Sequence, residues 1–176
     1  MAAIQACALP ADALLCKYLH EGAYADCYVT EVARPVSHAE YVEAFYTTAV
    51  FKAERLLLAW FVAKPSTDLQ AQELGAGKVS SFAAWSVEAR SPDQVLLSDF
   101  QGRTRSWLMR APATSGTSGN TRLYFGSAVV PMANARSWEP RMGIVFRALL
   151  GFHKLYSRAL LRAAASRLES SNSTES

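Results

Sequence analysis

The most regular alternation of apolar and polar positions lies near the C-terminus, in residues 140–168. Apolar side chains recur there every three or four residues: Val145, Leu149, Phe152, Tyr156, Leu160 and Ala163. Basic side chains fall on the opposite side of a helical projection: Arg147, Lys154, Arg158 and Arg162. This pattern predicts an amphipathic α-helix, about 40 Å long at roughly 1.5 Å per residue. A helix of this kind needs a broad apolar surface to lie on.

A period of two residues, typical of β-strands, dominates the middle of the chain. It predicts strands within the following segments: 24–34, 79–90, 94–99, 104–109 and 121–130. Pro35 stops the first strand, and Pro92 and Gly102 mark turns between later ones. We therefore expect an antiparallel meander after the first strand.

Two or three helices are expected between the first strand and the others. Ser37 with Glu40, and Thr67 with Gln70, match the capping-box pattern that begins a helix. Residues 51–63 form a further apolar segment that ends before Pro65. Helices followed by a run of strands favour an α+β fold, with about five strands and a long C-terminal helix.

Centring the two hairpins on Pro92 and Gly102 places a common set of residues on one face of the sheet: Trp85, Val87, Ala89, Val95, Leu97, Asp99, Arg105, Trp107 and Met109. In these registers Asp99 pairs with Arg105 at one end of an otherwise apolar face. The pair is either a polar anchor for a ligand or a salt bridge at the solvent rim, where it contributes about 0–1 kcal/mol. A slip of one residue in either turn would reverse the faces.

The 176 residues suggest a single domain over 24–169, after an N-terminal extension (1–23) and before a polar, disordered tail (170–176). A formal charge of +3, spread along the chain, gives no reason to expect a nucleic-acid partner. No apolar segment reaches the about 20 residues that cross a bilayer, and we expect no membrane span and no secretory signal. Three cysteines without CxxC spacing are interpreted as free thiols in a cytoplasmic protein.

Signals for catalysis are weak. His153 lies beside the apolar stripe of the last helix, either as a group that transfers protons or contacts a ligand, or as a hydrogen-bonded packing residue. Gly75-Ala76-Gly77-Lys78 lacks the spacing of a phosphate-binding loop. The histidines have no metal-binding spacing, so no metal site and no cofactor are predicted.

Two segments resemble a known family. The stretch FAAWSVEARSPDQVLLSDFQGRTRSWLM and the helix GFHKLYSRALLRAA, with Phe152-His153 and Arg158…Leu161-Arg162, are similar to a bacterial family of unknown function. That family resembles the helix-grip superfamily of START and birch-pollen-allergen-like (SRPBCC) proteins. The resemblance covers residues 24–168 and implies a helix-grip-like fold.

The resemblance also implies a cavity between the sheet and the closing helix that binds a small apolar or aromatic molecule. The expected lining residues are Trp85, Trp107, Phe125, Phe152 and Tyr156. The expected polar anchors are Asp99, Arg105 and His153. Two alternatives stay open: an enzyme of the cyclase, dehydratase or hydrolase type that uses Asp99 with His153, and a non-catalytic interaction or structural protein with a filled core. No catalytic residue and no oligomeric state follow from the sequence.

Overall fold

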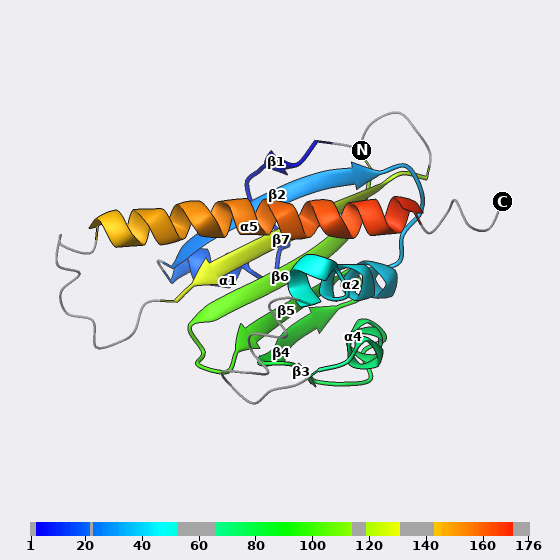
Figure 1. Cartoon of the computed structure of the whole chain (residues 1–176), viewed down its shortest axis with the longest axis horizontal. Coiled ribbons are helices and arrows are strands. Elements are labelled where there is room, and N and C mark those ends of the chain that lie inside the picture. The colour runs from blue at the N-terminus through cyan, green and yellow to red at the C-terminus, as the bar shows by residue number, and fades with distance from the viewer. Residues whose placement is uncertain (1–2, 22, 53–65, 114–118, 131–142, 171–176) are drawn as a thin grey trace.

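A computed structural model describes residues 3–21, 23–52, 66–113, 119–130 and 143–170 of the chain, without the side chains of 143–152 (Figure 1). The helices are α1 (Cys16–His20), α2 (His38–Tyr46), α4 (Asp68–Gly75) and α5 (Gly143–Ser170). The strands are β1 (Gln5–Ala6), β2 (Tyr24–Val32), β3 (Ser81–Phe82), β4 (Trp85–Ser91), β5 (Gln94–Asp99), β6 (Thr104–Pro112) and β7 (Thr121–Val129). The fold is α+β, as the order of the sequence patterns predicts.

Seven strands form one antiparallel sheet in the order β1-β2-β7-β6-β5-β4-β3. The first long strand, β2, therefore lies beside β7, the last strand that the structure describes, and the two pair from Tyr24↔Val129 to Val32↔Thr121. The predicted number of about five strands is wrong. It omits β1 and β3, which have two residues each and are too short to show an alternating pattern.

The long C-terminal helix α5 crosses one face of the sheet over β2 and β7, with α2 beside it (Figure 1). The strands direct alternate apolar side chains into the core beneath these helices: Tyr28, Val32, Val95, Leu97, Leu108, Leu123 and Phe125. The helices add the facing side chains: Tyr41, Phe45, Tyr46, Leu160, Leu161, Ala164 and Leu168. Burial of each large side chain contributes about 1.5–3 kcal/mol, so this core fixes the position of the C-terminal half of α5.

The capping boxes define where α2 and α4 begin. Ser37 Oγ accepts from Glu40 N, and Glu40 Oε2 accepts from Ser37 N at 2.8 Å. Thr67 and Gln70 repeat both bonds at the start of α4. Both predicted helix starts are confirmed. The predicted helix over 51–63 falls almost entirely outside the described residues.

The opposite face of the sheet carries a second, smaller core covered by the N-terminal segment. Its centre is Trp107, which is fully buried against Leu15 and Leu96. Gln94 fastens the segment: its Oε1 accepts from Trp107 Nε1 at 2.9 Å and from Leu14 N at 3.0 Å, and its Nε2 donates to Asp12 O at 3.1 Å. Residues before β2 are thus part of the packed structure.

The second predicted hairpin register is wrong by one residue. Leu97 pairs with Ser106 and Ser98 with Arg105, whereas the predicted register pairs Asp99 with Arg105. The cause is the turn, in which Asp99 Oδ1 accepts from the backbone N–H groups of Arg103 and Thr104 and so shortens the loop. The slip sends Arg105, Trp107 and Met109 to the N-terminal face.

The first hairpin register is correct near its open end only. Trp85 pairs with Asp99 and Val87 with Leu97, as predicted. A β-bulge between Val87 and Ala89 then places Ala89 opposite Leu96, on the N-terminal face. The sequence does not mark this bulge with a glycine or proline.

Candidate functional site

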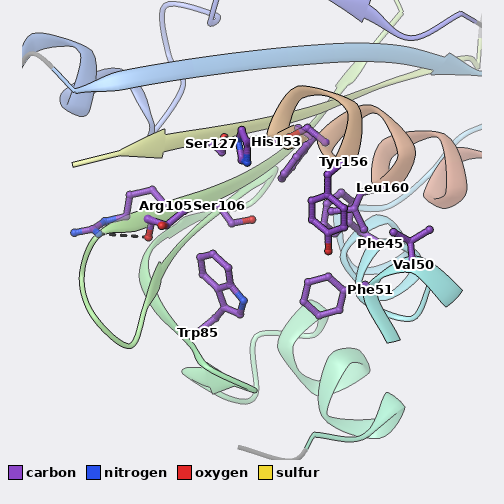
Figure 2. A pocket seen from close by; sticks show the side chains of 13 residues that line it. Phe45, Val50, Phe51, Trp85, Arg105, Ser106, Ser127, His153, Tyr156 and Leu160 are labelled. Atoms are coloured by element: carbon purple, nitrogen blue, oxygen red, sulfur yellow. Dashed lines mark hydrogen bonds between the residues drawn. The ribbon is translucent and has the colours of Figure 1, made fainter. Parts of the chain in front are cut away.

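A cavity of about 520 Å³ lies between the sheet and the helices α2 and α5. Most of its wall is aromatic or aliphatic: Phe45, Val50, Phe51, Trp85, Phe125, Tyr156 and Leu160. Figure 2 shows Tyr156 and Leu160 reaching down from α5 toward Phe45 and Phe51, with Trp85 opposite them. The polar part of the wall includes Ser106 and Ser127 from the sheet and His153 and Ser157 from α5. The cavity is therefore mainly apolar with a polar end.

The polar end is built on a row of residues that crosses three neighbouring strands. Asp26 on β2 lies directly opposite Ser127 on β7, and Ser127 lies opposite Ser106 on β6. All three belong to the inward phase of their strands, on the side of α5, and Ser106 Oγ lies 3.3 Å from the hydroxyl of Tyr46. Strand register alone thus gathers the polar groups at one place.

His153 on α5 completes this end of the cavity. Ser127 Oγ donates to Asp26 Oδ1 at 2.6 Å and lies 2.6 Å from His153 Nε2. Because the single hydroxyl proton is given to Asp26, His153 Nε2 must carry a proton and donate it to Ser127. His153 Nε2 also lies 3.7 Å from Asp26 Oδ2. The three side chains form a closed Asp26–Ser127–His153 network.

Asp26 is held in its ionised form within this network. Its side chain is only 9% exposed. Burial raises the pKa of the carboxyl, but the neighbouring His153 and the hydrogen bond from Ser127 lower it by more, and the net pKa lies below the ordinary 3.8. A buried carboxylate of this kind stays charged at neutral pH. The network can therefore orient His153 and offer a fixed hydrogen-bonding surface to a bound molecule.

Two polar groups of the cavity wall have no hydrogen-bond partner among the described residues. They are the indole Nε1 of Trp85 and the hydroxyl of Ser157, and both atoms are buried. Ser157 has no exposed surface at all. A buried donor without a partner costs about 1–3 kcal/mol, so these groups need an explanation.

The sequence-predicted site residues separate into different regions. Five of them line the cavity: Trp85, Arg105, Phe125, His153 and Tyr156. Trp107 lies on the opposite face of the sheet. Asp99 is occupied by the turn before β6. The side chain of Phe152 lies outside the described residues.

Arg105 borders the cavity, yet its charged group points elsewhere. Its Nε donates to Glu88 Oε2 at 2.6 Å and to the hydroxyl of Tyr18 at 2.7 Å, on the N-terminal face. Figure 2 shows the guanidinium directed away from the other labelled side chains. No ion pair joins Arg105 to Asp99 within the described part of the chain, so the predicted Asp99–Arg105 pair is wrong. The shortened turn before β6 is the physical reason.

Sequence reasoning missed Asp26 and Ser127. Each is a polar residue in the inward phase of a strand: Asp26 shares its phase with Tyr28 and Val32, and Ser127 with Phe125. An aspartate at a strand position that alternates with core residues could have indicated the network, because a buried carboxylate needs partners. The pairing of β2 with β7, which brings the two together, is not visible in the sequence.

Comparisons with protein-family models, with curated proteins and with solved structures gave no significant match. None of the described helices is long and apolar enough to cross a bilayer. Over the same residues, no three histidine, cysteine, aspartate or glutamate side chains come close enough together to hold a metal ion.

Proposed function

We propose that this protein binds a small, largely apolar molecule in the cavity between the sheet and α5. The observation that carries the proposal is the cavity itself, about 520 Å³ with an aromatic wall and one polar end. Small-molecule sites have volumes of about 300–1,000 Å³ and combine apolar walls with few polar groups. A structural protein would gain stability by filling such a space, because an empty apolar cavity reduces packing energy.

The arrangement of sheet and helix also supports the family resemblance seen in the sequence. A large antiparallel sheet that holds a long C-terminal helix on one face is compatible with a helix-grip fold. We therefore include membership of the START-like (SRPBCC) superfamily in the proposal. Fold likeness does not by itself assign a ligand, so the ligand has to be argued from the cavity wall.

A direct test uses the purified full chain. Native mass spectrometry of freshly prepared protein should show a co-purifying small molecule, and titration with the neutral fluorescent probe N-phenyl-1-naphthylamine should show saturable binding. Val50→Trp should fill the cavity and abolish probe binding. Leu155→Trp is the matched control, because Leu155 is 68% exposed and lies outside the cavity lining. Absence of saturable binding to the wild type would favour a purely structural protein.

A second candidate function is an enzyme in the same cavity. The Asp26–Ser127–His153 network favours it, since a carboxylate that orients a histidine is a common acid–base arrangement. It replaces the Asp99–His153 pair expected from the sequence. Conversion of a bound molecule that is lost in His153→Gln, with binding retained, would support the enzyme over the binding protein.

A further inference from the structure

The chemistry of the bound molecule can be narrowed from the polar atoms of the cavity wall. This step rests on the proposed function. The indole N–H of Trp85 is a pure donor, is buried, and has no partner within the described residues. In Figure 2 the indole nitrogen of Trp85 lies on the edge of the side chain that faces Phe51, toward the space between the labelled residues.

The charged groups near the cavity are already paired. Arg105 is bound to Glu88 and Tyr18, and His153 is bound to Ser127 and Asp26. No unpaired cation is thus present among the lining residues that the structure describes. An anionic ligand would lose its hydration without gaining a counter-charge, which is costly.

We infer that the ligand is a neutral, mainly aromatic or aliphatic molecule with a hydrogen-bond-accepting oxygen, such as a ketone, that accepts from Trp85 Nε1. The hydroxyl of Ser157, also buried and unpartnered, belongs to the same wall and is the second candidate donor. A ligand oxygen restores the hydrogen bond that the folded protein leaves unmade. Apolar contacts with the aromatic wall supply the remaining binding energy.

Three probes of similar size separate the possibilities: 2-acetylnaphthalene, its isosteric hydrocarbon 2-isopropenylnaphthalene, and the anion 2-naphthoate. Each is measured by displacement of N-phenyl-1-naphthylamine from the wild-type protein. The ketone should bind about tenfold more tightly than the hydrocarbon, the effect of one hydrogen bond, and the anion should bind more weakly than both. Trp85→Phe should bring the ketone down to the affinity of the hydrocarbon.

The controls keep this inference separate from the proposed function. Failure of every probe to bind the wild type contradicts the binding function. Equal binding of ketone and hydrocarbon to the wild type, or a tenfold preference that survives in Trp85→Phe and in Ser157→Ala, overturns the inference alone. If Trp85→Phe fails to fold, the comparison of ketone with hydrocarbon in the wild type still decides the inference, and Ser157→Ala, in which alanine is well tolerated within a helix, measures the contribution of the second group.

A second, independent feature is the pair Cys7 and Cys27 on the edge of the sheet. The pairing of β1 with β2 places Cys7 opposite Cys27, and Cys7 N donates to Cys27 O at 3.0 Å. The two Sγ atoms lie 3.4 Å apart. Opposed Cβ atoms in a sheet are about 4.5–5.5 Å apart, against about 3.5–4.5 Å in a disulfide. A small shift of the short strand β1 would therefore suffice to join them.

We propose that Cys7 and Cys27 form a disulfide bond when hydrogen peroxide reaches Cys7. The Cys7 thiolate attacks one peroxide oxygen, which gives a sulfenic acid and releases hydroxide. The Cys27 sulfur then attacks the Cys7 sulfur, the S–S bond forms as the S–O bond breaks, and water leaves with the Cys27 proton. The two thiols lose two electrons and two protons in total, and peroxide is reduced to water.

The environments of the two thiols support this order of steps. Cys7 is half-buried, whereas Cys27 is buried. Burial, together with the hydrogen bond to Cys7, raises the pKa of Cys27, so Cys7 is the better first nucleophile. Cys16 is bound instead to Pro10 O through its thiol, at 3.2 Å. The disulfide would close the loop that contains α1 and fasten the N-terminal segment to β2.

Tryptic peptide mapping of the full chain tests this directly, because Lys17 separates the peptide with Cys7 from that with Cys27. After peroxide treatment of the reduced protein, the two peptides should be joined, with a mass lower by two hydrogens than their sum. The link should persist in Cys16→Ser and disappear in Cys7→Ser and in Cys27→Ser. Oxidation of Cys7 to higher acids without a link in Cys16→Ser, or a link that survives in Cys7→Ser, overturns the proposal.

Discussion

Asp26 and Ser127 lie directly opposite each other on β2 and β7, and Ser127 Oγ donates a 2.6 Å hydrogen bond to Asp26 Oδ1. His153 reaches the same hydroxyl from α5. The network therefore links β2, the first long strand, with the last strand and the last helix that the structure describes, β7 and α5. It joins these elements at the polar end of the cavity, where apolar packing alone would leave their relative position less defined.

Asp26→Asn should reduce stability, and the loss should depend on pH. The folded protein holds the pKa of Asp26 below its ordinary 3.8. The ionised carboxylate thus stabilises the fold above that value, and this contribution is lost as the pH falls through the lower, folded-state pKa. We expect a loss of about 1–3 kcal/mol near neutral pH, which shrinks as the pH falls below the ordinary value of 3.8. Urea unfolding of both proteins across this range measures it.

An equal loss of stability at neutral and acidic pH would contradict this assignment. Ser127→Ala is the companion variant, since it removes one hydrogen bond to Asp26 and leaves the carboxylate in place. Its destabilisation should also be larger at neutral pH than at acidic pH, because the bond to the charged form is the stronger one.

Arg105→Gln should lower stability without changing binding of the neutral probe. Arg105 is bound to Glu88 and Tyr18. Burial raises the pKa of Glu88, but the hydrogen bonds from Lys17 and Tyr18 lower it by more, and the net pKa lies below the ordinary 4.5. Loss of a partly buried, charge-assisted pair costs about 1.5–3 kcal/mol. Thermal unfolding and probe titration measure the two effects. A weaker affinity at unchanged stability would return Arg105 to the role of a ligand anchor.

Much of the fold could be predicted from the sequence, because each element carries its own local signal. The hydrophobic pattern over 140–168 predicts α5, described as Gly143–Ser170, and the capping boxes locate α2 and α4. The alternation over 121–130 predicts β7, described as Thr121–Val129. Such signals depend on a few neighbouring residues and are independent of the rest of the chain.

The site was less accessible to prediction, because it depends on register and on long-range pairing. A single extra turn contact, Asp99 to the amides of Arg103 and Thr104, moves Trp107 and Arg105 to the other face. The residue type did not indicate which face Trp107 occupies, since a tryptophan packs equally well in either core. The Asp26–Ser127 pair required the neighbourhood of β2 and β7, which lie about a hundred residues apart in sequence and follow no local rule.

Gln94→Ala should loosen the N-terminal segment. One amide side chain binds Trp107 Nε1, Leu14 N and Asp12 O, so its removal leaves three polar groups unsatisfied. We expect a loss of about 1–3 kcal/mol from Trp107 Nε1, whose bond to Gln94 is buried, and a smaller contribution from the two part-buried backbone groups. Hydrogen exchange should become faster in residues 12–20, while the core under α5 stays protected. Uniform loss of protection would show that the two cores unfold together.

Gly126→Ala should destabilise the protein although alanine adds only one methyl group. Gly126 lies on β7, and a Cβ there would stand 2.9 Å from Trp107 Cε3 and 3.0 Å from both Leu15 Cδ2 and Asp26 O. Trp107 and Leu15 are fully buried and cannot move aside without disturbing the N-terminal core. Overpacking of this kind costs about 1–3 kcal/mol. Urea unfolding should show the loss, and Gly126→Ala combined with Leu15→Ala should lose less than the sum of the two single variants, because the shortened side chain makes room for the new methyl group.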